Sequence, residues 1–136
     1  MAQESFNVGL LRAAKNGNTE TVDSMLAQGA SVDATDEAGS TPLMLAAGLG
    51  HQKSVRSLIS AGADIDRADG SGWTALLRSA RRGHVAVMRE LLSAGADINA
   101  HDRLGWNGLL RACRSGSLEA VQLLLDAGID LNARNK

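Results

Sequence analysis

The chain has 136 residues, of which 44% are hydrophobic and 21% are charged, and its formal net charge is −1. This length predicts one domain, and the apolar content is too high for a disordered chain. Aromatic residues make up only 2% of the chain while glycines number 15, a balance that argues against a β-sandwich. The sequence has no apolar run of 18 residues and no basic leader, so we expect neither a transmembrane helix nor a signal peptide.

The glycines repeat with a period of 33 residues. Eleven of the fifteen fall into three registers of this period, which are Gly17, Gly50, Gly83 and Gly116; Gly29, Gly62, Gly95 and Gly128; and Gly39, Gly72 and Gly105. Side chains follow the same period, with leucines in one register and small residues in another: Leu10, Leu43, Leu76 and Leu109; Ala14, Ala47, Ala80 and Cys113. Self-similarity at a fixed period of this length predicts a repeat architecture.

Each period predicts a helix, a turn, a second helix and then a β-turn or hairpin. The first helices are expected at residues 10–15, 43–48, 76–82 and 109–114. In the third unit the first helix ends at Gly83, and a second apolar helix over residues 85–92 ends at Gly95. The first unit has no hairpin and a polar second helix. None of these helices is long enough to be stable alone, so we expect the units to stabilise one another by stacking.

These motifs resemble those of the ankyrin repeat family. Residues 36–51 read Asp-Glu-Ala-Gly-Ser-Thr-Pro-Leu-Met-Leu-Ala-Ala-Gly-Leu-Gly-His, and residues 95–100 read Gly-Ala-Asp-Ile-Asn-Ala. The resemblance covers essentially the whole chain and implies an all-α fold with β-turn or hairpin loops, a solenoid of stacked helix-turn-helix units. It implies one ankyrin repeat domain over residues 1–136, with repeats near 3–35 (an N-terminal cap), 36–68, 69–101 and 102–136.

No constellation in the sequence predicts catalysis, a metal site or a cofactor, so we expect a protein that is not an enzyme. The resemblance implies that His51 and His84 make a structural hydrogen bond at the start of the second helix. Cys113 replaces a small residue of the repeat, and we expect it in the core. As the single cysteine it excludes an intramolecular disulfide and favours a reducing compartment. One register of aspartates is expected to start turns and accept hydrogen bonds from backbone N–H groups: Asp36, Asp69 and Asp102.

Basic residues are concentrated on the expected first helices, whose segments contain no Asp or Glu. The resemblance implies that these helices and the hairpin tips line a concave groove that binds partners. Two registers three residues apart lie on the same helix face and hold Arg12, Arg78 and Arg111, and Lys15, Arg81 and Arg114. The candidate partner-binding residues are therefore Arg12, Lys15, Trp73, Arg78, Arg81, Arg82, Arg103, Trp106, Arg111 and Arg114.

The two tryptophans, Trp73 and Trp106, lie one repeat apart at the expected hairpin tips, next to arginines. This composition is typical of a binding anchor. Two interpretations remain open for each feature. The tryptophans either anchor a partner or pack over the neighbouring hairpin and stiffen the array, and the basic rows either bind a ligand or form a solvated face.

The expected function is a non-catalytic protein-interaction module that binds an acidic or phosphorylated segment in its groove, without a metal or cofactor. Two alternatives remain. Arginines and tryptophans also suit a nucleotide or single-stranded nucleic acid, and the chain could be an engineered scaffold without a natural ligand. The Thr-Pro motif is intact only at Thr41-Pro42, which favours a natural chain. We expect a monomer with a protein partner and no membrane partner, in the cytoplasm, with the nucleus as the alternative.

Overall fold

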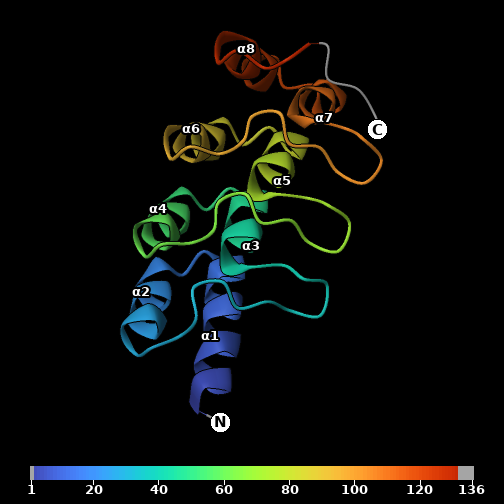
Figure 1. The fold of residues 1–136 in the computed structure, drawn as a ribbon. Coiled ribbons are helices and arrows are strands. Elements are labelled where there is room, and N and C mark those ends of the chain that lie inside the picture. Colours follow the sequence, from blue (N-terminus) through green and yellow to red (C-terminus); the bar gives the residue numbers. More distant parts are fainter. Residues whose placement is uncertain (1, 132–136) are drawn as a thin grey trace.

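The structure is a computed structural model that describes residues 2–131. These residues form eight α-helices, which occur as four consecutive pairs (Figure 1). The helices are α1 (Ala2–Asn16), α2 (Thr19–Ala27), α3 (Pro42–Gly48), α4 (Gln52–Ser60), α5 (Ala75–Arg81), α6 (Val85–Ser93), α7 (Gly108–Ser115) and α8 (Leu118–Asp126). The all-α solenoid expected from the sequence is confirmed.

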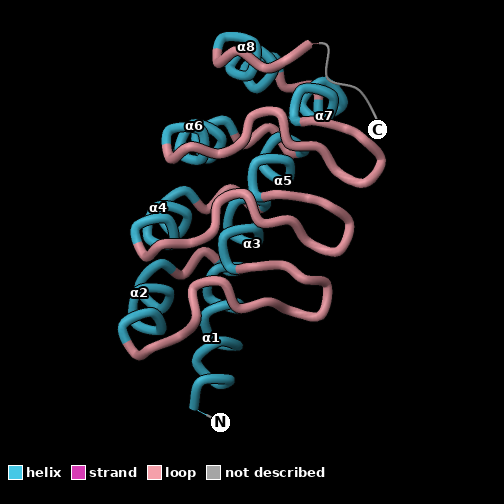
Figure 2. Tube along the Cα trace, viewed as in Figure 1, coloured by secondary structure: helices cyan, strands magenta, loops and turns pink. Residues whose placement is uncertain are grey.

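The helices form two columns. Helices α1, α3, α5 and α7 stack in one column, and α2, α4, α6 and α8 stack in the other (Figure 1). Each helix packs on its partner in the pair and on the next helix of its own column. Long loops project on the side of the first column (Figure 2). Within residues 2–131 these loops contain no strand, and His101 and Asn107 form an isolated antiparallel bridge.

Side-chain caps begin the first helices of three pairs. Thr41, Thr74 and Asn107 precede α3, α5 and α7, and each accepts a hydrogen bond from the backbone N–H three residues later, at 3.2, 3.2 and 3.0 Å. This cap satisfies one of the free N–H groups of a helix start. It explains why α5 and α7 begin at the same register as α3 although only α3 has a proline at its first position.

Glycine ends the helices as the sequence predicts. The eleven glycines of the three registers are also the eleven that have a positive φ among the described residues. Gly83, with φ 68°, follows the cap residue of α5 and turns the chain toward α6. A residue with a side chain is strained in this conformation, whereas glycine is not. Two of the three glycine registers therefore follow helix ends, and the third, Gly39, Gly72 and Gly105, lies in the turns of the long loops.

The apolar core lies between the two columns and runs from α1 to α8 without a break. Leu10, Leu43 and Leu76 are at most 2% exposed, and Ala14 and its equivalents in the next two repeats are fully buried. The buried residues of all four helix pairs belong to one continuous cluster. Burial is thus shared between repeats, which is how helices of seven to nine residues become stable here.

Two expectations are wrong at the ends of the array. Helix α1 is 15 residues long, extends back to Ala2 and includes Glu4, so the first column is not free of acidic residues. Cys113 is exposed, although Ala80 at the same register is fully buried by the following repeat. Among the described residues, no helix stacks beyond α7 and α8 (Figure 1). For the same reason Leu110 is 44% exposed, whereas Leu77 at its register is fully buried.

Candidate functional site

The loop tips are held by aspartate side chains. Oδ1 of Asp69 accepts hydrogen bonds from the backbone N–H groups of Ser71 and Trp73, at 2.8 and 3.0 Å. Oδ1 of Asp102 does the same for Leu104 and Trp106, at 2.9 and 3.0 Å. The predicted turn role of these aspartates is confirmed. It also fixes the backbone of each tryptophan in the turn at the loop tip.

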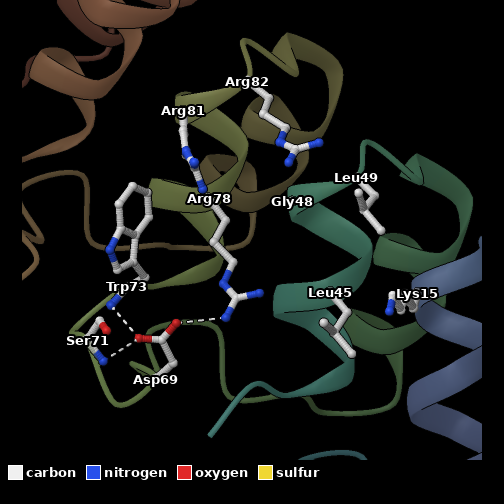
Figure 3. Close-up of a pocket in the computed structure, with 10 residues that line it drawn as sticks. All are labelled: Lys15, Leu45, Gly48, Leu49, Asp69, Ser71, Trp73, Arg78, Arg81 and Arg82. Carbon is white, nitrogen blue, oxygen red and sulfur yellow. Dashed lines mark hydrogen bonds and ion pairs between the residues drawn. The ribbon is translucent and has the colours of Figure 1, made fainter. Parts of the chain in front are cut away.

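The second carboxylate oxygen of each aspartate binds an arginine from the following helix. Oδ2 of Asp69 accepts a hydrogen bond from Nη2 of Arg78 at 2.7 Å (Figure 3). The same nitrogen donates to Oγ of Ser40 at 2.6 Å. Oδ2 of Asp102 accepts from Nε of Arg111 at 3.1 Å and from its Nη2. Both arginines are candidate partner-binding residues, yet each is already ion-paired within its own repeat.

These ion pairs control the charge state of the aspartates. Burial disfavours the ionised form of Asp102, but hydrogen bonds from Arg111 and from the Trp106 N–H outweigh burial, so the pKa of Asp102 lies below its ordinary value. Burial acts in the same way on Asp69, and the hydrogen bond from Arg78 again outweighs it and lowers the pKa. Asp69 and Asp102 are therefore ionised and paired with arginine at neutral pH, so neither offers a free negative charge to a ligand.

The tryptophans and arginines form an alternating stack across two repeats. The guanidinium of Arg111 lies 4.3 Å from the centroid of the Trp73 ring and 4.5 Å from that of Trp106. The guanidinium of Arg81 also lies 5.7 Å from the centroid of the Trp73 ring, and that of Arg114 lies 5.9 Å from that of Trp106. Cations at these distances from an aromatic ring are attracted to its face. Arg111 thus contacts both rings, and each ring has one exposed arginine as a second neighbour.

A hollow of about 430 Å³ lies beside this stack, between α1, α3, α5 and the loop before α5. Its cationic lining comes from Lys15 on α1 and from Arg81 and Arg82 on α5 (Figure 3). Between them, on α3, lie the side chains of Leu45 and Leu49. Lys15, Arg81 and Arg82 are exposed, and none of the ion pairs found within residues 2–131 includes them.

A second hollow, of about 420 Å³, lies one repeat further along. It is lined by Trp73, Arg81, Arg111, Arg114 and Ser115. Arg81 lines both hollows, which places them side by side on the same face. The remaining candidate residues lie elsewhere. Arg12 lines a separate hollow on α1, with Glu4 and Val8 among its neighbours, and Arg103 is exposed at the tip of the last long loop.

Comparison with known protein families agrees with this architecture. The family model for ankyrin repeats, three copies long, matches residues 10–102 and 67–135. The chain belongs to the ankyrin repeat family. Ankyrin repeats are generally protein–protein interaction modules and are typically not enzymes. Comparison with curated protein sequences gives no match.

The histidines of this ankyrin array connect repeats and do not cap their own helices. His51 and His84 precede α4 and α6, and neither side chain makes a hydrogen bond that caps its own helix. Instead, Nε2 of His51 lies 3.0 Å from the carbonyl oxygen of Lys15 in the preceding repeat. The imidazole reaches this carbonyl because Gly17 has no Cβ, which would lie 2.5 Å from Nδ1 of His51.

His84 takes the equivalent place one repeat later. Its Nε2 is buried and has no hydrogen-bond partner among the described residues. Burial lowers the pKa of His84, the carbonyl of Gly48 opposes this shift, and the positive charge of Arg82 adds to it. The imidazole is therefore held neutral inside the ankyrin stack, which is a structural role.

The described part of the ankyrin domain contains no group of three or more His, Cys, Asp or Glu side chains arranged to hold a metal ion. None of its helices is long and apolar enough to span a membrane. Sequence reasoning missed several residues that line the hollows, among them the serines Ser71 and Ser115 and three apolar residues, Leu45, Gly48 and Leu49. A signal existed for Leu45 and Gly48, because each interrupts a register that is basic in the other three repeats.

Proposed function

We propose that this ankyrin domain is a non-catalytic interaction module that binds an acidic segment of a partner protein along its first helix column. The observation that carries the proposal is the charge of that face. Lys15, Arg81, Arg82 and Arg114 are exposed around two adjoining hollows, and none of the ion pairs within residues 2–131 includes them. Carboxylates or phosphates of a partner would supply the missing counter-charges, and arginine can bind either in a bidentate manner.

Within this proposal the candidate residues have two roles. Arg78 and Arg111 hold Asp69 and Asp102, so they position the loops and tryptophans. Arg81 and Arg114 remain available to a ligand. An exposed ion pair contributes only about 0–1 kcal/mol, so affinity requires several such contacts along an extended acidic segment. Binding should consequently weaken as ionic strength rises.

The proposal includes the domain boundaries, the oligomeric state and the location of the protein. We propose that residues 1–136 form one monomeric domain of four repeats, with boundaries near 3–35, 36–68, 69–101 and 102–136. The proposed location is the cytoplasm or the nucleus, in keeping with a single free cysteine in a reducing compartment. Size-exclusion chromatography with light scattering tests the monomer, since a dimer would have twice the 14.2 kDa mass of the chain.

The test compares two charge reversals of equal size in a pull-down from host-cell lysate, read by mass spectrometry. Arg81→Glu/Arg114→Glu reverses the cations of the proposed face. Lys53→Glu/Arg89→Glu makes the same charge change at exposed positions of α4 and α6. A protein retained by the wild type and by the control, but lost with the first variant, supports the proposal. Equal recovery by all three would contradict it.

Nucleic acid is the second candidate ligand, because the arginine–tryptophan stack carries both the charge and the ring surface that bases use. The geometry is less favourable here, since Arg111 already covers one face of each ring. Nuclease treatment of the lysate separates the two ligands. If the bound material disappears after nuclease treatment, the ligand is nucleic acid and not a protein. If neither the wild type nor any variant retains a partner, a scaffold without a ligand is favoured.

A further inference from the structure

The basic rows of the first helix column are interrupted in one repeat. Two registers carry the rows and a third, which holds a single arginine, lies beside them; in each of the three the second repeat departs from its neighbours. They read Arg12, Leu45, Arg78, Arg111; Lys15, Gly48, Arg81, Arg114; and Asn16, Leu49, Arg82, Ser115. In the second repeat all three positions are apolar. We call Leu45, Gly48 and Leu49 the apolar notch.

The notch lies open on the surface between charged neighbours. Leu49 is 39% exposed and Leu45 is half-buried, and both line the hollow of about 430 Å³. In Figure 3 Leu45 on α3 and Leu49 just after its end lie between Lys15 on one side and the arginines at and after the end of α5 on the other. A stripe of positive charge is thus divided by a hollow with an apolar wall.

Gly48 is what keeps this hollow open. A Cβ at residue 48 would lie 3.4 Å from Cβ and 3.6 Å from Cδ of Arg78, so the stem of that arginine already occupies the space beside the glycine. A long side chain at residue 48 would have to extend into the hollow. Lys15, Arg81 and Arg114 do carry long side chains at this register.

We propose that the notch receives one apolar side chain of the acidic segment, and that acidic residues on both sides of it contact Lys15 and Arg81. This inference rests on the proposed function and names the pattern of its ligand. A segment of acidic residues alone would place a carboxylate over Leu45 and Leu49, where it loses water without gaining a partner. A leucine or phenylalanine in the same place would bury its own apolar surface and that of Leu49.

The helix spacing sets the distance between anchor and acids. Packed helices lie about 8–10 Å apart, and an extended chain advances about 3.3 Å per residue. A segment running along the column therefore needs about three residues to pass from α3 to α1 or to α5. The pattern is an acid, two residues of any kind, the apolar anchor, two further residues of any kind, and a second acid.

The test uses two fluorescein-labelled peptides, Glu-Glu-Ser-Ser-Phe-Ser-Ser-Glu-Glu and the same sequence with serine in place of phenylalanine. Fluorescence anisotropy at low salt gives both dissociation constants. We expect the phenylalanine peptide to bind about tenfold more tightly, which corresponds to 1.4 kcal/mol. Added salt should weaken both peptides and leave their ratio unchanged, because only the ionic contacts are screened.

Two variants test the notch itself. Gly48→Arg gives the second repeat a residue type that α5 and α7 carry at this register, so the fold tolerates it. It should remove the tenfold preference while the serine peptide binds as well as before or better. Leu49→Ser, which introduces the residue found at the same register in the last repeat, should reduce the preference without added charge. Leu110→Ser removes a leucine of similar exposure, 44%, outside the notch and should change nothing.

The outcomes separate the inference from the proposed function. If the wild type binds both peptides equally, the notch does not take an anchor, and the acidic-segment function stands. If neither peptide binds at low salt, the proposed function fails together with the inference. Tighter binding of a single-stranded oligothymidylate than of the phenylalanine peptide would assign the notch to a nucleobase and overturn the protein ligand.

Discussion

The guanidinium of Arg111 binds the carboxylate of Asp102, which precedes it by nine residues and is only 1% exposed in its side chain. The same arginine lies between the rings of Trp73 and Trp106. One side chain therefore fixes the loop tip and both aromatic rings. These contacts hold Trp73, Trp106 and the loop tip in fixed positions relative to one another on the basic face.

Arg111→Met should destabilise the protein strongly. The substitution leaves a buried carboxylate without its counter-charge, and breaking such a pair by removing one partner costs about 3–5 kcal/mol. Chemical denaturation followed by circular dichroism measures the free energy of unfolding. Arg82→Met, at an exposed position, should change it by less than about 0.5 kcal/mol. Equal effects of the two variants would show that the ion pair contributes nothing.

Stability should fall in acid because of Asp69 and Asp102. Each has a folded-state pKa below its ordinary value. Such a group stabilises the fold above the unfolded-state pKa, about 3.9, and this stabilisation is lost as pH falls through the folded-state pKa. The measurement is the thermal midpoint between pH 5 and pH 2. In Asp69→Asn/Asp102→Asn, whose amide oxygens can still accept the turn hydrogen bonds, the midpoint should be lower at pH 5 and should fall less toward pH 2.

His84 should add a second pH dependence at higher pH. Its folded-state pKa is lowered by burial, so the unfolded chain binds a proton near pH 6.5 while the folded protein does not. The free energy of unfolding should therefore decrease as pH falls from 7.5 to 5.5. Denaturant titrations at these two pH values measure the change, and His84→Gln should reduce it. His101→Gln, at an exposed position, is the control that should leave it intact.

Gly72 and Gly62 separate two costs of replacing a glycine. Both have a positive φ, 82° and 90°. A Cβ at Gly72 would lie 2.9 Å from the backbone nitrogen of Arg103, whereas nothing lies within 4 Å of one at Gly62. Gly62→Ala should destabilise by about 1–2 kcal/mol from backbone conformation alone. Gly72→Ala should destabilise by about 2–5 kcal/mol, because the neighbouring loop must also move. Urea denaturation of both variants gives the comparison, and equal losses would contradict it.

Cys113 should react with a thiol reagent in the folded protein. It is exposed, although the small residue at its register is buried in each of the three preceding repeats. The measurement is the rate of modification by Ellman's reagent, with and without denaturant. We expect the two rates to differ by less than about tenfold, since exposure and not unfolding controls access. A thiol that reacts only after unfolding would place Cys113 in the core.

The helices could be predicted from the sequence because each repeat places the same demands on the same positions. A helix end that needs a positive φ favours glycine in every repeat, and a position that faces the next pair, such as Leu43, must be apolar each time. Gly83 and Leu43 could therefore be read from the period alone. Cys113 could not, because its burial depends on a helix packing beyond α7, and a register contains no information about where the stacking stops.

The candidate site could be predicted only in part, because residue type does not determine which partner a side chain meets. The row that contains Arg78 and Arg81 was visible in the sequence, but the two arginines have different roles. Arg78 points back to Asp69 across a turn and a helix start, a contact that depends on how the loop folds over α5. The sequence also shows that Gly48 interrupts a basic row. Its role in an apolar hollow could be inferred only from the structure, which shows the hollow beside it.

Each helix pair contacts only the pairs next to it, and this arrangement determines how the molecule can open. Among the described residues, α7 and α8 have a neighbour on one side, whereas α3 and α5 are covered on both. The first pair, α1 and α2, likewise has a neighbour on one side. Within the described residues, local unfolding is therefore expected to begin in one of the two end pairs and to travel inward. The walls of the hollow formed by α3 and α5 lie in the part of the array that opens last. A transient loss of the final pair would release Trp106 and Arg114 while Leu45, Leu49 and Lys15 keep their places.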